Sequence, residues 1–377
     1  MEKISKHQLF CLVMMGQIGS TNLWALGIEA KQDAWIVILI SLLIGLGLVW
    51  LFTRLQSKLP AENIAEITQT AIGKVLGWPL GFLYFLMFTF NCTRNTSEFA
   101  DLINMTFLQE TPRTIIMIIF MAAMTYVLFL GIETFARVTE IILPLMVILI
   151  ILIYLMVLVS GRMDFKELTP VLGNGIKPVL AAVYPVGINF PFGLAFLFFQ
   201  LWPYCLGLPG KEIRRTTLLA VFLSGLILTI TLIIIITTLG TNIAANATIP
   251  LLEVIKLINI GEFITNIDAV GVLMIFIGGF YLGILNFFSA VLVFAKLFKI
   301  NNYKWVLIPL AIFILWYAGV YEPNYPFHVK FLIPQYWQQF VPLFNIVIIL
   351  LFVTLLLKQY CGASTKVKKG SHYKGGK

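Results

Sequence analysis

The sequence predicts an all-α integral membrane protein with about ten transmembrane helices. Hydrophobic residues make up 60% of the chain and charged residues only 11%. A soluble domain usually contains about 45–50% apolar and about 25% charged residues. So few charges cannot cover a surface that faces water, whereas a surface that faces lipid needs no such cover. Long apolar runs separated by short basic segments support the same class.

Ten apolar segments approach the length of about 20 residues that a helix needs to cross a bilayer. The third is unusually long and contains three charges, and the ninth is short. No small-residue cleavage site follows the first, which predicts a retained helix and not a signal peptide. In chain order, the predicted spans are 8–28, 34–53, 80–107, 115–132, 141–160, 179–202, 217–240, 267–295, 305–320 and 338–357.

The basic residues predict the orientation of these spans. Ten spans place both termini on one side, and Lys and Arg are enriched in cytoplasmic loops. Alternate segments, which include 211–215 and 296–304, carry most of the 26 Lys and Arg residues. The bias persists when the lysine-rich C-terminal tail is left out. We therefore expect both termini on the cytoplasmic side.

We expect one transmembrane domain over residues 1–360 and a basic, disordered cytoplasmic tail over 361–377. The tail lacks an apolar repeat, and its lysines favour a position near anionic lipid headgroups. In the predicted outer loop 241–266, the run PLLEVIKLINIGEFI from Pro250 is amphipathic. It predicts a short helix that lies on the membrane, plugs an outer vestibule or is an ordinary surface helix.

Small and polar residues interrupt the first and sixth spans at mid-depth, in the strings MGQIGSTN and YPVGINFPFG. Each interruption alone is compatible with helix packing or a proline kink. These spans begin two five-helix halves, about 7–160 and 175–358, and an odd number of spans inverts the second half. Interrupted helices at equivalent places in inverted halves indicate a midplane substrate site, where half-helix N-termini can hold an anionic group.

The third span places Asn91, Arg94, Glu98 and Asp101 on one helix face. A lone charge at the bilayer centre is unfavourable by about 2.5–3.5 kcal/mol, so this face must look into the bundle or a wet cavity. Arg94 and Glu98 are spaced to pair, which leaves Asp101 as an excess negative charge. Two roles stay open for this intramembrane charge network: a buried network that locks the helix in place, or a cation, proton or amino-group site.

The eighth span contains a stripe of small residues that favours close helix packing, although Asn286 also suits a cavity wall. The three histidines lie outside the predicted spans, and the four cysteines show neither metal-ligand nor disulfide spacing. Zinc-hydrolase, Walker A and nucleophile-elbow motifs are absent from the sequence. We therefore expect no enzyme activity, no metal, no cofactor and no nucleic-acid partner.

Four strings carry a resemblance to a known family: LQETPRT at 108–114, GIETFARVTEIILP at 131–144, ELTPVLGNGIKPVL at 167–180 and FPFG at 190–193. In this order and spacing, the chain resembles the B subunits of the spore germinant receptors. These are endospore germination permeases of the amino acid–polyamine–organocation superfamily. The resemblance covers nearly the whole chain and implies a LeuT-like fold of five-plus-five inverted repeats with broken helices 1 and 6.

The resemblance also implies a place in the spore inner membrane, beside an A subunit and a lipoprotein C subunit. It implies that the protein senses a small nutrient, often an amino acid. In this family the first, third, sixth and eighth helices line the ligand pocket. Carried over by position, the ligand-binding residues are Gly16, Gln17, Gly19, Ser20, Tyr84, Asn91, Phe192, Gly193, Phe196, Leu282 and Asn286.

One position departs from the family pattern. Members often carry an acid directly after the FPFG glycine, where this chain has Leu194. Our leading hypothesis is a germinant-receptor subunit that binds a nutrient at the midplane and signals to partner subunits. The alternatives are a proton- or sodium-coupled amino acid transporter of the same fold and a ligand-blind scaffold or pore component. Neither pocket contains a residue type that demands an amino acid over a sugar or nucleoside.

Overall fold

The computed structural model describes residues 2–258, 268–321 and 338–370, and every regular element in these ranges is helical. Within them, nine helices are long and apolar enough to cross a membrane. Their ranges coincide with the second to tenth predicted spans, which confirms the predicted fold class. The longer elements are α1 (Lys6–Ile18), α2 (Ala34–Gln56), α3 (Ile64–Ile72), α4 (Lys74–Thr106), α5 (Arg113–Leu130), α6 (Ile132–Val159), α7 (Ile176–Ile188), α8 (Gly210–Asn246), α9 (Pro250–Leu257), α10 (Asp268–Leu297), α11 (Lys304–Tyr321) and α13 (Gln338–Gly370).

Five short 3₁₀ segments join or interrupt these helices. The first predicted span divides into α1 and a 3₁₀ turn, so neither part alone is long enough to cross a membrane. In the same way, the sixth predicted span divides into α7 and a 3₁₀ helix. The 3₁₀ segments are η1 (Thr21–Leu23), η2 (Ile28–Asp33), η3 (Phe165–Leu168), η4 (Phe192–Gln200) and η5 (Trp202–Tyr204).

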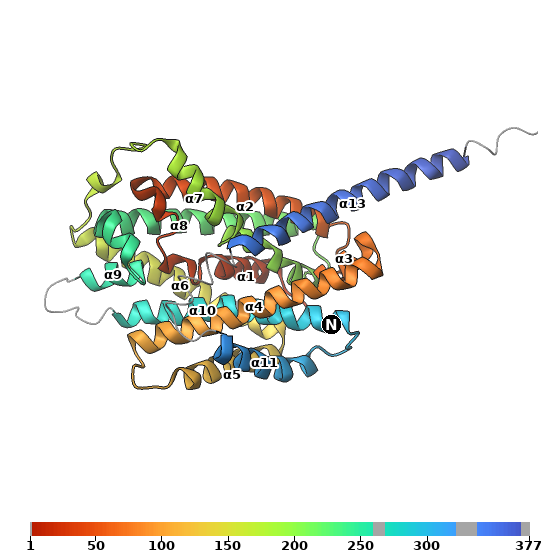
Figure 1. Cartoon of the computed structure of the whole chain (residues 1–377), viewed down its shortest axis with the longest axis horizontal. Helices are drawn as coiled ribbons and strands as arrows, with labels where there is room; N and C mark the ends of the chain where they lie inside the picture. The colour runs from red at the N-terminus through yellow and green to blue at the C-terminus, as the bar shows by residue number, and fades with distance from the viewer. Residues whose placement is uncertain (1, 259–267, 322–337, 371–377) are drawn as a thin grey trace, which may run out of the picture.

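The helices form two groups whose packing partners exchange between the two halves of the chain. Equivalent helices of the two halves contact each other where α2 meets α8 and where α4 meets α10. Elsewhere α2 packs on α7 as α8 packs on α1, and α11 packs on α4 as α5 packs on α10. Figure 1 shows α2, α7 and α8 along one side, α4, α5, α10 and α11 along the other, and α1 between them. Inverted five-helix halves require this exchange.

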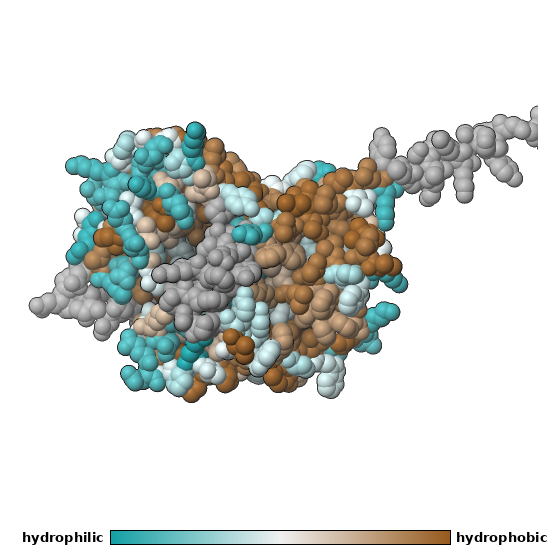
Figure 2. All heavy atoms as spheres, viewed as in Figure 1, coloured by the Kyte–Doolittle hydropathy of each residue, from teal (hydrophilic) through white to brown (hydrophobic). Residues whose placement is uncertain are grey.

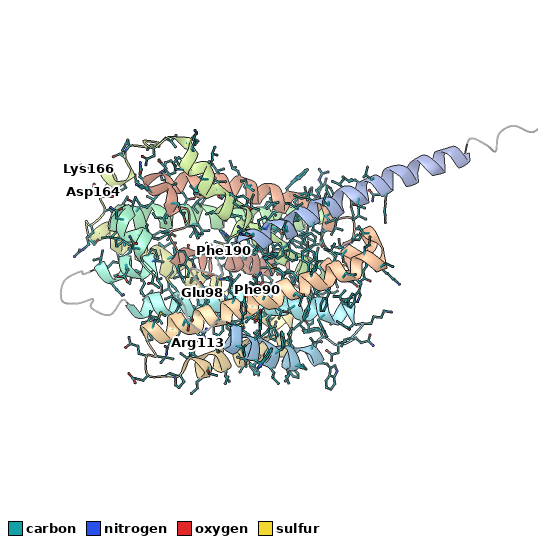
Figure 3. All side chains as sticks on the ribbon, viewed as in Figure 1. Phe90, Glu98, Arg113, Asp164, Lys166 and Phe190 are labelled. Atoms are coloured by element: carbon teal, nitrogen blue, oxygen red, sulfur yellow. The ribbon has the colours of Figure 1, made fainter. Side chains whose placement is uncertain are left out.

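The N-terminal segment closes one end of the bundle. The Glu2 carboxylate accepts a hydrogen bond of 3.0 Å from the Ile132 N–H at the start of α6, and Ile4 donates to the Tyr204 carbonyl. The C-terminal end of α13 leaves the bundle at this same end (Figure 1). The loop with Asp164 and Lys166 lies at the opposite end (Figure 3). The side of the membrane that each end faces remains a prediction.

Figure 2 shows the surface that this arrangement produces. Apolar residues cover much of the right half of the visible face, and hydrophilic residues gather at its left end. Large apolar side chains such as Leu43, Ile141 and Ile312 are exposed at the surface of the bundle. Such a surface matches an environment of lipid chains, and the protein is a multi-pass integral membrane protein.

Two short helices lie outside the spans. The predicted loop helix is present as α9, and its apolar side chains, which include Leu251, Val254 and Ile255, are buried. Because α9 packs against α8, α10 and η1, it inserts into the bundle and does not lie on the membrane surface. The part of the predicted run after Ile258 lies outside the described residues. The sequence analysis missed α3, although a capping box of Asn63 and Glu66 begins it.

The end of α13 differs from the prediction. The backbone is helical as far as Gly370, ten residues into the segment predicted to be a disordered tail from residue 361. Adding residues to an existing helix fixes one residue for each new hydrogen bond, so extension is easier than nucleation. Residues 371–377, the remainder of the predicted tail, lie outside the described residues.

Candidate functional site: two helix breaks at the centre of the bundle

The first break follows α1 and is held together by its own segment. Helix α1 ends at Ile18, and the Asn22 side chain donates a hydrogen bond of 2.9 Å to the Ile18 carbonyl. Thr231 on α8 donates to the Asn22 Oδ1 at 3.2 Å and is also hydrogen-bonded to the Tyr154 hydroxyl of α6. The Ile18 carbonyl, which the break frees from the helix, is therefore hydrogen-bonded within the protein and needs no ligand for this.

The backbone of the first break also touches α10. A Cβ atom added to Gly278 would lie 2.2 Å from the Gly19 carbonyl oxygen, and one added to Gly19 would lie 3.1 Å from the Gly278 Cα. No side chain fits at either position without moving backbone. The glycines therefore allow close approach between the first break and α10, as small residues do in membrane helix pairs.

The second break separates α7 from η4. The Asn345 Nδ2 of α13 donates to the carbonyl oxygens of Ile188 and Gly193, at 3.0 Å each. These carbonyls belong to the last residue of α7 and the first turn of η4, so one side chain bridges the two half-helices. A Cβ atom at Gly193 would lie 1.7 Å from the Ile188 oxygen, so this position requires glycine. Figure 3 places Phe190, within the break, near the centre of the bundle.

An aromatic cluster joins the second break to α4 and α13. The Tyr84 ring lies 6.4 Å from that of Phe196 and 4.9 Å from that of Phe344, measured between centroids. The Tyr84 hydroxyl donates to the Phe344 carbonyl at 2.9 Å. Phe88 packs on Phe196 at 5.8 Å. The structure therefore brings together two predicted pocket residues, Tyr84 and Phe196, from helices more than a hundred residues apart.

The other predicted ligand-binding residues are buried, apart from the half-buried Gly16. Gly16 faces α10, because a Cβ there would lie 2.8 Å from the Leu285 side chain. Phe192 packs over Gly45 of α2, so its ring belongs to the contact between α2 and η4. The remaining residues of this set are Gln17 and Ser20 beside the first break, Asn91 on α4, and Leu282 and Asn286 on α10.

Several buried amides leave an oxygen without a donor among the residues that the structure describes. Asn286 donates its Nδ2 to the Leu282 carbonyl at 2.9 Å, while its Oδ1 has no partner. The Oε1 of Gln17 and the Oδ1 of Asn345 are also buried and without a partner. Buried polar atoms are usually hydrogen-bonded, so such orphaned acceptors mark places for a ligand or water.

The charges of α4 form two ion pairs, one of them with α5. Arg94 pairs with Glu98 at 3.0 Å, as their spacing predicts. The prediction that Asp101 is an excess negative charge is wrong, because its Oδ1 lies 2.6 Å from the Arg113 guanidinium. Arg113 also donates to the Ser97 hydroxyl. The sequence analysis assigned Arg113 to a loop, and only the fold turns it back onto α4.

This pairing favours the structural role for the α4 charges. The Asp101–Arg113 salt bridge fixes α4 against α5, whereas the Arg94–Glu98 pair lies within α4. Figure 3 shows Glu98 on α4 and Arg113 at the start of α5. Among the described residues, no group of three or more His, Cys, Asp and Glu side chains is arranged to hold a metal ion.

The predicted ligand-binding set does not include Asn345, which bridges the second break. One signal was available, since Asn345 is the only amide side chain in the apolar run 340–357. An amide inside lipid demands partners, which predicts a contact within the bundle. Those partners are two carbonyls of α7 and η4, more than 150 residues away in the sequence, and only the fold determines them.

The inverted packing and the two central breaks define a permease-type membrane protein with a LeuT-like fold. Solved transporters share this fold at low identity. A nucleobase-cation-symport-1 family transporter, Mhp1, with bromovinylhydantoin bound, has a TM-score of 0.65 at 14% identity, over 94% of this chain and 76% of that one. MhsT in complex with L-phenylalanine has a TM-score of 0.67 at 15% identity, over 92% and 88%.

Family membership is more specific than the fold. The chain belongs to the spore germination protein family, whose model matches residues 3–325. It is 30% identical to spore germination protein KB of Bacillus subtilis (strain 168), over 87% of each chain. It is 24% identical to spore germination protein XB of Bacillus anthracis, over 71% of this chain and 75% of that protein. These matches relate the chain to permeases and transporters and not to enzymes.

Proposed function

We propose that this protein is the membrane subunit of a spore nutrient-germinant receptor. It binds a small nutrient, an amino acid in the leading hypothesis, between the two broken helices and passes a conformational change to partner subunits. The proposed pocket consists of the eleven predicted ligand-binding residues. A nutrient acts through such a receptor only if it binds one of two conformations more tightly than the other.

The pair of central helix breaks carries this proposal. Broken helices free backbone groups at mid-depth, where an intact helix frees none, and those that no side chain satisfies can bind a solute. In this chain, both breaks lie against helices of the group formed by α4, α5, α10 and α11. The first break contacts α10, and the second contacts α4 through Tyr84 and Phe196. Movement of one group against the other would therefore alter both breaks together.

A coupled amino acid transporter is the second candidate. The observation in its favour is that MhsT, in complex with L-phenylalanine, shares the fold over most of both chains. Against ion coupling, each of the acids Glu98 and Asp101 is paired with an arginine. Leu194 also stands where members of the family often carry an acid.

The partners and location that we propose follow from the family. They are a germinant receptor A subunit, a lipoprotein C subunit and the lipid of the spore inner membrane. We place both termini on the cytoplasmic side, because the basic segments 211–215 and 296–304 lie beside the N-terminal segment, where Lys6 pairs with Glu212 and Tyr303 donates to Glu2. The exposed apolar surface of the spans provides the contacts with lipid and with partner helices.

Spores that lack the gene test the proposal directly. They are exposed to single amino acids, sugars and nucleosides, and germination is followed for each nutrient. We expect loss of response to one nutrient class, with restoration by the intact gene. The Gly19→Trp variant should not restore it, because that side chain would displace α10. Gly47→Trp is the matched control, since a Cβ at Gly47 meets no atom within 4 Å.

The outcomes separate the candidates. An unchanged response to every nutrient in the deletion strain, with other receptors also deleted, would exclude the receptor function. Restoration by Gly19→Trp would exclude a role for the first break in ligand binding. Uptake of the active nutrient by vesicles that contain the protein alone, driven by a proton or sodium gradient, would favour the transporter.

A further inference from the structure

Asn345 combines two properties that a purely structural cap does not need. Its Nδ2 bridges the Ile188 and Gly193 carbonyls, and its Oδ1 is buried without a partner among the described residues. The whole side chain is only 2% exposed. An unpaired buried acceptor destabilises a folded protein, so its presence calls for a partner that the described residues do not supply.

The two carbonyls fix the direction of this amide. Both are acceptors, so only the nitrogen, with its two hydrogens, can face them. A flipped amide would place oxygen against oxygen twice. The Oδ1 therefore turns away from the carbonyls while it stays beside the break, where it can accept a hydrogen bond but cannot donate one.

The surroundings of Asn345 are those of the proposed pocket. Its neighbour Phe344 packs on Tyr84 and Phe196 and accepts the Tyr84 hydroxyl hydrogen bond. Its amide nitrogen is bonded to Gly193. Three of the eleven residues that the resemblance implies for ligand binding therefore contact residues 344 and 345.

We propose that Asn345 is a ligand-binding residue of this site and that its Oδ1 accepts a hydrogen bond from a donor group of the nutrient. The proposal rests on the proposed function and adds the chemistry that the ligand must present. The donor is an ammonium group in an amino acid and a hydroxyl group in a sugar or nucleoside. Because the same amide holds α7 to η4, the ligand contact is coupled to the geometry of the second break.

A double-mutant-type cycle tests this contact: the Asn345 side chain and the donor group of the ligand are removed separately and together. The full chain in lipid nanodiscs is incubated with radiolabelled L-alanine, D-glucose or inosine. Each labelled probe that binds is then displaced by the same unlabelled compound or by an analogue that lacks the donor. The analogues are propionate for L-alanine, a deoxyglucose for D-glucose and a deoxyinosine for inosine. For the wild-type protein, we expect removal of the contacted donor to weaken binding about ten- to a hundredfold, as for a lost hydrogen bond in a buried site.

In Asn345→Leu, removal of the same donor should change affinity less than about threefold, because the acceptor is gone. Asn345→Ser serves if the leucine variant does not fold, since its hydroxyl can still donate to a carbonyl while the amide acceptor is lost. Ile348→Val, one turn along the same buried face of α13, should keep the wild-type discrimination.

Discrimination as in the wild type in both Asn345 variants would overturn the inference and leave Asn345 as a helix cap. Failure of the wild-type protein to bind any probe of the three classes would remove the proposed function, and this inference would fall with it. The two failures are distinguished by the wild-type protein alone.

Discussion

The two helix breaks occupy equivalent positions in the two halves, but different parts of the chain satisfy their backbone groups. At the first break, Asn22 of the same segment donates to the Ile18 carbonyl. At the second, the donor is Asn345, which lies on the last helix of the chain. The first break is therefore nearly self-contained, whereas the second depends on the position of α13.

This difference separates two roles within one site. The first break is pressed against α10 through Gly19 and Gly278, and a backbone contact of this kind tolerates little movement. The second break is bridged by one side chain, whose hydrogen bonds can lengthen or exchange. The two roles are a fixed contact at the first break and an adjustable one at the second.

The largest expected effect comes from filling the glycine contacts. Gly278→Val and Gly193→Val should each lower the free energy of unfolding by about 3 kcal/mol or more, because the added Cβ meets backbone that cannot move aside. Melting temperature and size-exclusion profile of the purified protein are the measurements. Gly319→Val is the control, since no atom lies within 4 Å of a Cβ there. Wild-type melting of either variant would contradict the backbone contact at that break.

Removal of the two amides tests the comparison itself. Asn345→Leu leaves two carbonyls without their side-chain donor, and Asn22→Leu leaves one. At about 1–3 kcal/mol for each unsatisfied buried group, the loss of stability should be about twice as large at the second break. Thermal unfolding of both variants measures it. Equal losses would show that the second break does not depend on α13 more than the first depends on Asn22.

The charge network on α4 provides a smaller effect, away from both breaks. Asp101→Asn or Arg113→Gln alone should destabilise by about 2 kcal/mol, less than for a fully buried pair, because the Arg113 side chain is 20% exposed. The double variant should recover part of this loss. If Asp101 instead bound a coupling cation, Asp101→Asn would abolish the sodium or pH dependence of the ligand response. We expect that dependence to be the same in the variant as in the wild type.

The smallest effect is expected at the start of α1. Lys6 and Glu212 form an ion pair of 2.5 Å in which the side chains are 52% and 38% exposed. Solvent and salt screen such a pair, and ordering two long side chains offsets the attraction. Lys6→Ala should therefore leave the melting temperature unchanged at physiological salt. A clear decrease would mean that the Lys6–Glu212 pair stabilises the start of α1, in addition to the contacts at the break that follows α1.

Much of the fold could be predicted because its signals are local. Hydropathy over about 20 residues locates the spans, and the glycine and proline residues of the first and sixth spans locate the breaks. The pairing of Arg94 with Glu98 follows from helical spacing. The capping box at Asn63 and Glu66 was an equally local signal for α3 that the sequence analysis did not use.

The remaining features join residues that are far apart in the chain. Local patterns cannot show that Arg113 turns back onto Asp101, or that Gly19 meets Gly278. They also cannot show that Asn345 reaches Ile188 and Gly193 from another helix. Glycine, proline and polar residues inside an apolar span show from the sequence alone where a membrane helix breaks. The backbone groups that the break exposes must then find partners in the protein, because lipid cannot satisfy them. Which side chain satisfies those groups depends on how the helices pack, and here the packing selects Asn22 at one break and Asn345 at the other.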